Sequence, residues 1–113
     1  MLIIYHNNSC SKSREALKAL TKSDEEFQIV NYLEDIPSVV ELKNILQKLG
    51  CKPHDLIRTN EKVYLEKYKG KELTDEEWII AMHENPILIQ RPIVVNGDRA
   101  VIARTDDALD EIL

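Results

Sequence analysis

The chain has 113 residues, 43% of them hydrophobic and 31% charged, so we expect one globular domain over residues 1–113 that needs no disulfide or metal to hold its core. The net charge of −5 argues against broad neutralisation of a nucleic-acid backbone, and hence against a nucleic-acid partner. Cys10 and Cys51 are too few and too far apart for a disulfide framework or a metal cluster. The first residues form neither a signal peptide nor a membrane span, so a reduced, cytoplasmic monomer without a membrane partner is expected.

The first third of the sequence predicts a strand, a helix and a second strand. The apolar run at residues 2–5 is typical of a strand covered on both faces. Residues 11–20 have the apolar spacing of an amphipathic helix, and residues 27–32 read as the next strand. A strand–helix–strand unit of this length predicts two parallel strands joined by a right-handed crossover.

A mostly helical segment is predicted after the second strand. Ser38 opens a capping box ahead of an apolar stripe, and Gly50 suits the left-handed residue that ends such a helix. Residues 53–70 give weaker signals for two short helical pieces. Thr74 opens a second capping box, and the helix that it starts ends at an Asn-Pro pair.

The clearest local signal is a β-hairpin over residues 91–104. Two β-rich runs flank Asn96 and Gly97, a pair that tolerates the positive φ angles of a tight turn. Thr105 then caps a last helix that runs to the end of the sequence. The order β-α-β, helical insertion, β-β-α is that of an α/β thioredoxin-like fold, a mixed sheet with the insertion between its second and third strands.

Cys10 lies in a polar loop between the first strand and the first helix. Free N–H groups and the helix dipole stabilise a thiolate at the start of a helix. His6, Lys12 and Arg14 add positive charge nearby, and Asn8 is among the polar neighbours that distinguish this loop from a core. We therefore predict that Cys10 is an ionised nucleophile; the alternative is a small buried hydrophobic side chain.

The hairpin brings two arginines together. Arg91 precedes its first strand and Arg104 follows its second, so they lie at the open end within a residue or two of facing each other. Two guanidinium groups would repel each other without an anion, and each presents a planar fork of donors that fits an oxyanion or a carboxylate. Alternatively, each is a solvated charge. Pro92 holds the position of the cis proline of thioredoxin-like proteins, so a cis bond is our hypothesis there.

Several segments together match one known family. They are the loop from Tyr5 through Cys10 to Arg14, Leu56-Ile57-Arg58, residues 85–95, Arg104 and the closing helix. On these residues the sequence resembles the glutaredoxin-coupled arsenate reductases of the thioredoxin-like superfamily over essentially its full length. The resemblance implies that Cys10 attacks arsenate, that Arg58, Arg91 and Arg104 form the anion pocket, that His6 tunes the thiol, and that Ser13 hydrogen-bonds the thiolate.

Two departures mark this sequence within that family. Ser11 and Lys12 follow the cysteine where the best-characterised members have a glycine, and this Cys-Ser-Lys-Ser-Arg form looks like a subgroup. Thr105 follows the third arginine where proline is frequent. The chemistry of the thiol is therefore a firmer implication of the resemblance than arsenate as the substrate.

The spacing around Cys10 predicts a mechanism with one thiol. Ser13 occupies the position where dithiol oxidoreductases carry their second cysteine. Cys10 would attack the oxyanion while arginines stabilise the charge; glutathione would then attack as co-substrate, and glutaredoxin would clear the mixed disulfide. Cys51 is a possible resolving thiol, although a structural role is preferred. No bound cofactor and no metal site are expected.

Two other functions use the same fold. One is a redox-responsive regulatory or adaptor protein that binds RNA polymerase; such relatives typically carry Cys-x-x-Cys and lack the third arginine, so Ser13 and Arg104 favour the enzyme. The other is a glutathione-linked reductase of an organic substrate, whose arginines would hold a carboxylate.

Overall fold

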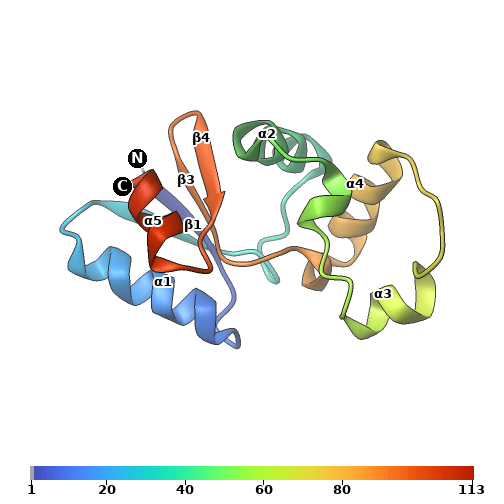
Figure 1. Cartoon of the computed structure of the whole chain (residues 1–113), viewed down its shortest axis with the longest axis horizontal. Coiled ribbons are helices and arrows are strands. Elements are labelled where there is room, and N and C mark those ends of the chain that lie inside the picture. Colours follow the sequence, from blue (N-terminus) through green and yellow to red (C-terminus); the bar gives the residue numbers. More distant parts are fainter. Residues whose placement is uncertain (1) are drawn as a thin grey trace. The chain divides into compact units, whose positions relative to one another are not determined.

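The structure is a computed structural model that describes residues 2–113 (Figure 1). These residues form two compact units, one of Arg91–Leu113 with the residues up to Asp35, the other of Ile36–Gln90. We call them the sheet unit and the helical unit. The expectation of a single domain over residues 1–113 stays a prediction.

The sheet unit contains all four strands. They form one mixed sheet in the order β2-β1-β3-β4, in which β1 pairs parallel with β2 and antiparallel with β3, and β3 pairs antiparallel with β4. This confirms the predicted thioredoxin-like α/β arrangement. The elements are β1 (Leu2–His6), α1 (Ser11–Lys22), β2 (Phe27–Asn31), β3 (Ile93–Asn96), β4 (Arg99–Ile102) and α5 (Asp106–Ile112).

The register of the parallel pair decides what lies at the end of the first strand. Leu2 pairs with Phe27, and His6 pairs with Asn31. His6 is the last residue of β1, and Asn31 is the last residue of β2. The next residue of each chain segment, Asn7 or Tyr32, therefore leaves the sheet at the same edge. Both are buried. The prediction had extended the second strand through residue 32, one residue too far.

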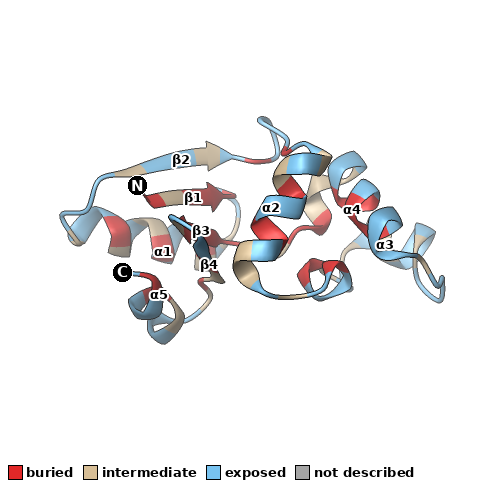
Figure 2. Cartoon of the chain, turned by 90° about the horizontal axis from the view of Figure 1, so that it is seen from above, coloured by how far each residue is buried: buried red, intermediate tan, exposed pale blue. Residues whose placement is uncertain are grey.

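Helices α1 and α5 cover one face of the sheet. Their apolar residues pack in one buried cluster with residues of β1 and β3 (Figure 2). The cluster holds α1 against β1, the two elements that the loop with Cys10 connects. Its buried members are Leu2, Ile4, Ala16, Leu20, Val94, Ala103, Leu109 and Ile112.

The hairpin differs in detail from the Asn-Gly turn that the sequence predicts. Asn96 is the last residue of β3 and pairs with Arg99, so the loop consists of Gly97 and Asp98. Gly97 has φ +64°, as the first loop residue of a type II′ turn requires. Glycine takes this conformation without a steric penalty. Gly97 is thus the first loop residue, whereas the sequence predicts it as the second.

The helical unit contains α2 (Val39–Leu49), η1 (Pro53–Leu56), α3 (Lys62–Lys67), α4 (Asp75–Glu84) and η2 (Pro86–Leu88). Ser38 caps α2 by accepting a hydrogen bond from the N–H of Glu41 at 3.1 Å, and Gly50 ends it with φ +70°. A full capping box joins Thr74 and Glu77 at 3.2 and 2.9 Å. The capping box at Thr74, the end of α2 at Gly50 and the two short helical pieces, η1 and α3, confirm the sequence predictions. Of the capping box predicted at Ser38, the bond accepted by the serine is confirmed.

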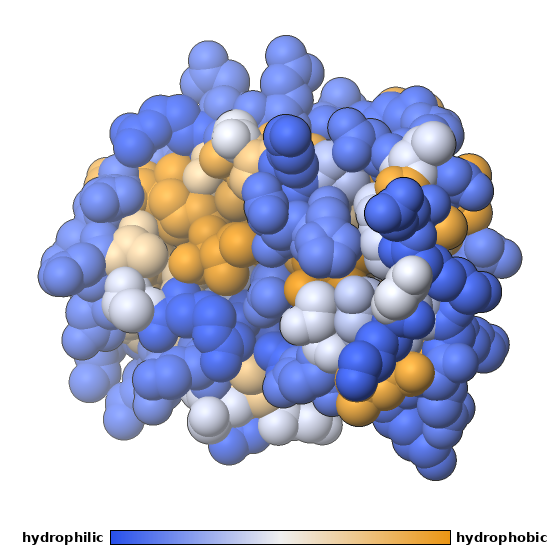
Figure 3. All heavy atoms as spheres, turned by 45° about the vertical axis from the view of Figure 1, so that its right-hand side comes forward, coloured by the Kyte–Doolittle hydropathy of each residue, from blue (hydrophilic) through white to orange (hydrophobic). Residues whose placement is uncertain are grey.

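Some apolar side chains remain on the surface. Figure 3 shows one face on which polar side chains cover most of the area and apolar patches lie between them. Val40 on α2 is 68% exposed, and Ile29, Leu65 and Ile80 are also exposed. Singly exposed apolar side chains such as these are ordinary surface features. Within residues 2–113, no helix combines the length and the apolarity that crossing a bilayer would take.

Candidate functional site

Cys10 caps the N-terminus of α1, at the junction that the sequence predicts. Its N–H donates to the carbonyl of Asn7 and its carbonyl accepts from the N–H of Arg14, both at 3.0 Å. The side-chain oxygen of Asn7 accepts the N–H of Ser9 at 2.9 Å, which tightens the loop. The cysteine is half-buried and free. A thiol held this way is accessible and lies within reach of the unpaired N–H groups of the first helical turn.

The pKa of the Cys10 thiol is lowered from its ordinary value. Partial burial of the sulfur acts in the opposite direction, but donors around it outweigh burial. They are the backbone N–H groups of Ser13 and Lys12 and the guanidinium of Arg91, which acts both as a hydrogen-bond donor and as a charge. Because each favours the charged form, Cys10 is ionised at a lower pH than an ordinary thiol.

Arg91 and Arg104 come together at the open end of the hairpin, as predicted. Ile93 pairs with Ile102, and the N–H of Ala103 donates to the carbonyl of Pro92 at 2.9 Å, so the next pair is Arg91 opposite Arg104. Nη1 of Arg104 donates to the carbonyl of Arg91 at 2.8 Å. The Arg91–Pro92 peptide bond is cis, which confirms that hypothesis.

The environment of Arg91 favours an anion. Its residue is only 8% exposed, and a buried guanidinium is costly unless a negative charge lies close by. The Cys10 thiolate is one such charge, since Arg91 hydrogen-bonds the sulfur. The second guanidinium, on Arg104, is held beside the backbone of Arg91 and offers further donors for a tetrahedral oxyanion.

Ser13 is a hydrogen-bond partner of the thiol, as predicted, but through its backbone N–H. Its side chain is 0% exposed; the hydroxyl accepts the N–H of Asn7 at 3.0 Å and lies 2.7 Å from Nδ1 of His6. His6 also lies 3.4 Å from the side-chain oxygen of Asn8 through Nε2. The buried His6–Ser13–Asn7 group therefore braces the cysteine loop, and the tuning of the thiol by His6 stays a prediction.

Replacing Ser13 by alanine should destabilise the fold. The change leaves the buried N–H of Asn7 and Nδ1 of His6 without their shared hydroxyl, and an unpaired buried polar group costs about 1–3 kcal/mol. Urea unfolding should show a loss of that size. Since the backbone N–H of residue 13 remains, the pH dependence of Cys10 alkylation should change little. Unchanged stability would contradict a bracing role for this hydroxyl.

The charges nearest in sequence to Cys10 act differently from the prediction. Nζ of Lys12 lies 3.6 Å from Glu15 in an exposed ion pair, and Lys12 acts on the thiol through its backbone N–H. Nη1 of Arg14 donates to the carbonyl of Asn8 at 2.8 Å. The cation that lowers the thiol pKa is instead Arg91, so Lys12 and Arg14 support the loop rather than supplying its charge.

Arg58 belongs to the helical unit, in the segment between η1 and α3. Its backbone N–H donates to the carbonyl of Leu88 at 2.7 Å, which fixes the segment beside η2. Its Nε donates to Glu61 at 3.2 Å, and both side chains are mostly buried. The guanidinium is thus held in place within its own unit. Its assignment to the anion pocket stays a prediction.

Cys51 is chemically unlike Cys10. Burial, and after it the charge of Asp55, raises the pKa of the Cys51 thiol above its ordinary value, although its own backbone N–H opposes them. The residue is a free, half-buried cysteine directly after Gly50, beyond α2. A thiol that stays protonated near neutral pH is a weak nucleophile. These facts favour the structural role preferred from the sequence.

Alkylation should therefore separate the two thiols by pH. Only thiolates react with iodoacetamide, so the pH at which alkylation reaches half of its maximal rate follows the pKa of each thiol. This pH should be lower for Cys10 than for an ordinary thiol, and higher for Cys51. Peptide mass spectrometry after timed alkylation measures both rates in one sample. Equal pH profiles would contradict the account of Cys10.

Tyr32 is a residue of this site that the sequence analysis assigned only to a strand. It is 1% exposed, and Arg91, Asn7 and Cys10 all lie close enough to act on its hydroxyl. The available signal was positional: in a parallel pair, the residue after the second strand lies beside the residue after the first, which here leads to Cys10.

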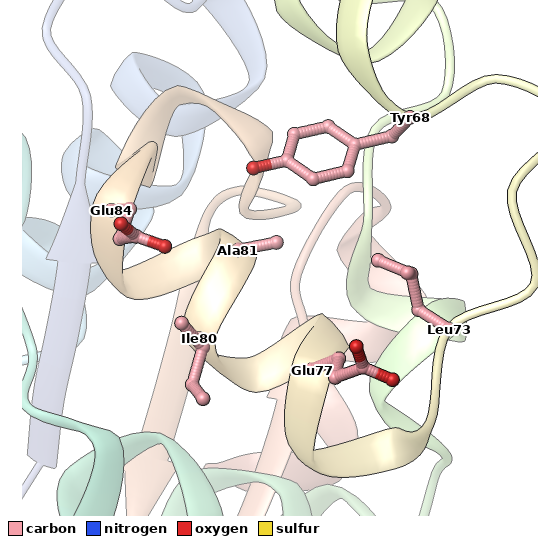
Figure 4. Close-up of a pocket in the computed structure, with 6 residues that line it drawn as sticks. All are labelled: Tyr68, Leu73, Glu77, Ile80, Ala81 and Glu84. Carbon is pink, nitrogen blue, oxygen red and sulfur yellow. The ribbon is translucent and has the colours of Figure 1, made fainter.

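A hollow in the helical unit suits an anion poorly. In the helical unit, Tyr68 and Leu73 face α4 across a hollow of about 310 Å³ whose other lining residues are Glu77, Ile80, Ala81 and Glu84 (Figure 4). The two carboxylates among them would repel an oxyanion. None of the described lining residues is basic, so none would attract it. Within residues 2–113, no three His, Cys, Asp or Glu side chains gather in a way that could hold a metal ion.

Comparison with known proteins points to one family. The family model described as ArsC matches residues 5–112. Similar proteins include an arsenate reductase of Haemophilus influenzae, 40% identical and covering 99% of this chain and 98% of that protein, and one of Escherichia coli, 35% identical over 99% of this chain and 80% of that protein. A solved structure, an arsenate reductase from Vibrio cholerae, has a TM-score of 0.94 and 42% identity, and covers 99% of this chain and 97% of that chain.

Proposed function

The chain belongs to the ArsC family, and from this premise we propose that it reduces arsenate, with Cys10 as the nucleophile, glutathione as co-substrate and glutaredoxin as the partner that regenerates the thiol. Relatives over nearly the whole chain carry the name arsenate reductase. Reduction by a single cysteine is the mechanism that the residues around the thiol support best.

One observation carries the proposal: the buried guanidinium of Arg91 hydrogen-bonds the Cys10 sulfur, and Arg104 is held against the backbone of Arg91. The nucleophilic sulfur is thus in direct contact with a guanidinium that can bind an oxyanion. Held there, an arsenate has its central atom near the thiolate and its oxygens near fixed donors, and such positioning lowers the barrier to attack.

The first step is addition without a change of oxidation state. The Cys10 thiolate attacks arsenic, a sulfur–arsenic bond forms, and one arsenate oxygen leaves as water after protonation. Arg91 and Arg104 stabilise the negative charge on the remaining oxygens as the bond forms. The lowered pKa of Cys10 raises the fraction of thiolate above that of an ordinary thiol at the same pH.

The second step is the reduction. Glutathione thiolate attacks the Cys10 sulfur, a disulfide bond forms, and the electron pair of the broken sulfur–arsenic bond stays on arsenic, which leaves as arsenite. Two thiols have then lost two electrons and arsenic has gained them. Glutaredoxin returns Cys10 to the thiol by thiol–disulfide exchange, and a second glutathione supplies the remaining electrons. Ser13 offers no resolving thiol, which is why an external one is required.

A coupled assay tests the proposal. The full chain is mixed with arsenate, glutathione, glutaredoxin, glutathione reductase and NADPH, and NADPH oxidation is followed. We expect turnover that depends on both arsenate and glutaredoxin. Phosphate, a tetrahedral oxyanion of the same charge type that thiols do not reduce, is the matched control. Absence of arsenate-dependent oxidation would overturn the proposed activity.

A further inference from the structure

We propose that Tyr32 is a further binding residue of this site, whose hydroxyl donates a hydrogen bond to an oxygen of the anion held between Arg91 and Cys10. The inference deepens the proposed function and rests on it in one respect, namely that an oxyanion binds beside Arg91. It assigns a role to a residue that lies far from the other site residues in sequence.

The first observation is the burial of the Tyr32 hydroxyl, a polar group. Tyr32 is 1% exposed, and no hydrogen bond of standard geometry to its hydroxyl is made within residues 2–113. Asn7 and Arg91 act on its oxygen as donors, but at less favourable geometry. Leaving a hydroxyl buried without a partner typically costs about 1–3 kcal/mol, and most buried polar groups have partners. A group retained at this cost is a candidate for an interaction made only with a ligand.

The second observation is the chemistry of its neighbours. Arg91 and Asn7 lie near the hydroxyl, and so does Cys10. A guanidinium can only donate, and the side-chain oxygen of Asn7 already accepts from Ser9. No hydrogen bond of standard geometry joins the hydroxyl to these neighbours, so its hydrogen is free to point at an anion that comes to lie beside Arg91. An oxygen of a tetrahedral oxyanion is an acceptor of the right kind.

The third observation is the placement of Tyr32 by the fold. His6 pairs with Asn31 at the end of the parallel strands, so Tyr32 follows the sheet at the edge where the loop to Cys10 begins. This placement is set by backbone hydrogen bonds and does not depend on a flexible side chain. The ring carries its hydroxyl on two rotatable bonds, so little entropy is lost when the hydrogen bond forms.

The ionisation of Tyr32 agrees with a donor role. Burial raises the pKa of its hydroxyl above the ordinary value, although Arg91 and Asn7 oppose the rise. The hydroxyl is therefore protonated throughout the neutral range and has a hydrogen to donate. A phenolate in this position could only accept, and it would repel an incoming oxyanion.

The test is the variant Tyr32→Phe, which removes one oxygen and keeps the ring. Binding is measured without turnover, as the arsenate concentration that half-protects Cys10 from iodoacetamide, and stability is measured as the melting temperature without ligand. We expect the half-protecting concentration to rise about tenfold, the size expected for a hydrogen bond to a charged group. The melting temperature should stay the same or rise, since an unpaired buried hydroxyl is removed.

Tyr68→Phe is the matched control. Tyr68 lies in the helical unit, and its hydroxyl accepts a hydrogen bond from Asn85 at 3.1 Å. This variant should melt at the same or a lower temperature than the wild type and leave protection by arsenate unchanged. The pair of variants thus contrasts the loss of an unpaired hydroxyl with the loss of a paired one.

The outcomes separate this inference from the proposed function. Wild-type protection that Tyr32→Phe leaves unchanged would overturn the role of Tyr32 and spare the enzyme. A lowered melting temperature with unchanged protection would make Tyr32 a structural residue only. Protection of wild-type Cys10 without turnover in the coupled assay would overturn the proposed reductase activity. The binding role of Tyr32 would then still be decided by whether Tyr32→Phe raises the half-protecting arsenate concentration. No protection of wild-type Cys10 by arsenate would overturn both.

Discussion

Replacing Cys10 by serine should abolish arsenate reduction and leave the fold intact. A serine hydroxyl is a far weaker nucleophile than a thiolate at neutral pH and cannot form the disulfide that carries electrons to arsenic. We expect the rate in the coupled assay to fall to that of the mixture without protein. Serine is nearly isosteric with cysteine, and the backbone bonds of residue 10 to Asn7 and Arg14 do not involve its side chain, so the urea midpoint should change little.

Cys51→Ser is the matched control, because it makes the same atom change at the other thiol. The pKa of the Cys51 thiol is raised mainly by burial, and no step of the proposed mechanism uses it. Turnover should stay within about twofold of the wild type. A large loss in Cys51→Ser would show that a second thiol takes part. Retained turnover in Cys10→Ser would end the claim that Cys10 is the nucleophile.

The second large effect is expected at Arg91. Arg91→Ala removes a hydrogen-bond donor and a positive charge from the thiol, so the pKa of Cys10 should rise and the alkylation profile should move to higher pH. It also removes donors for the charge that develops on the oxyanion, and loss of one such donor typically lowers kcat about 10²–10³-fold. Alkylation and the coupled assay measure the two effects separately.

Arg99→Ala is the control for the loss of charge. Arg99 begins β4 in the same hairpin, at its closed end, and its side chain donates to the carbonyl of Glu111 at 3.1 Å. Its removal changes the net charge equally but should leave the thiol profile in place. Arg91→Lys should give an intermediate result, since it keeps the charge and loses the planar fork. If Arg91→Ala and Arg99→Ala behave alike, the effect of Arg91 is a general effect of charge.

The sequence predicts the fold well where the signals are local. Apolar runs, capping boxes and turn residues identify the helices and strands, and Ser38, Thr74 and Gly50 act as their patterns indicate. Errors occur where pairing decides the outcome. The hairpin loop is Gly97 and Asp98 because β3 includes Asn96, and β2 ends before Tyr32 because its partner strand ends at His6.

The features of the site, too, were predicted where the signals are local and missed where the tertiary fold decides. The spacing of the hairpin is enough to bring Arg91 opposite Arg104, and the strand-to-helix junction is enough to place Cys10 at a helix start. The source of the positive charge at the thiol was predicted only in part. Lys12 and Arg14 are near in sequence, yet their side chains bind Glu15 and the backbone of Asn8, because a helix directs neighbouring side chains to different sides. Arg91 reaches the sulfur through the tertiary fold.

A single-turnover experiment tests the central claim most directly. The chain is incubated with arsenate and glutathione but without glutaredoxin, and arsenite and modified peptides are measured. The proposed mechanism predicts about one arsenite per chain and a glutathione disulfide on Cys10 that forms only when arsenate is present. Arsenite without a disulfide on Cys10, or a disulfide that forms equally well without arsenate, would contradict it.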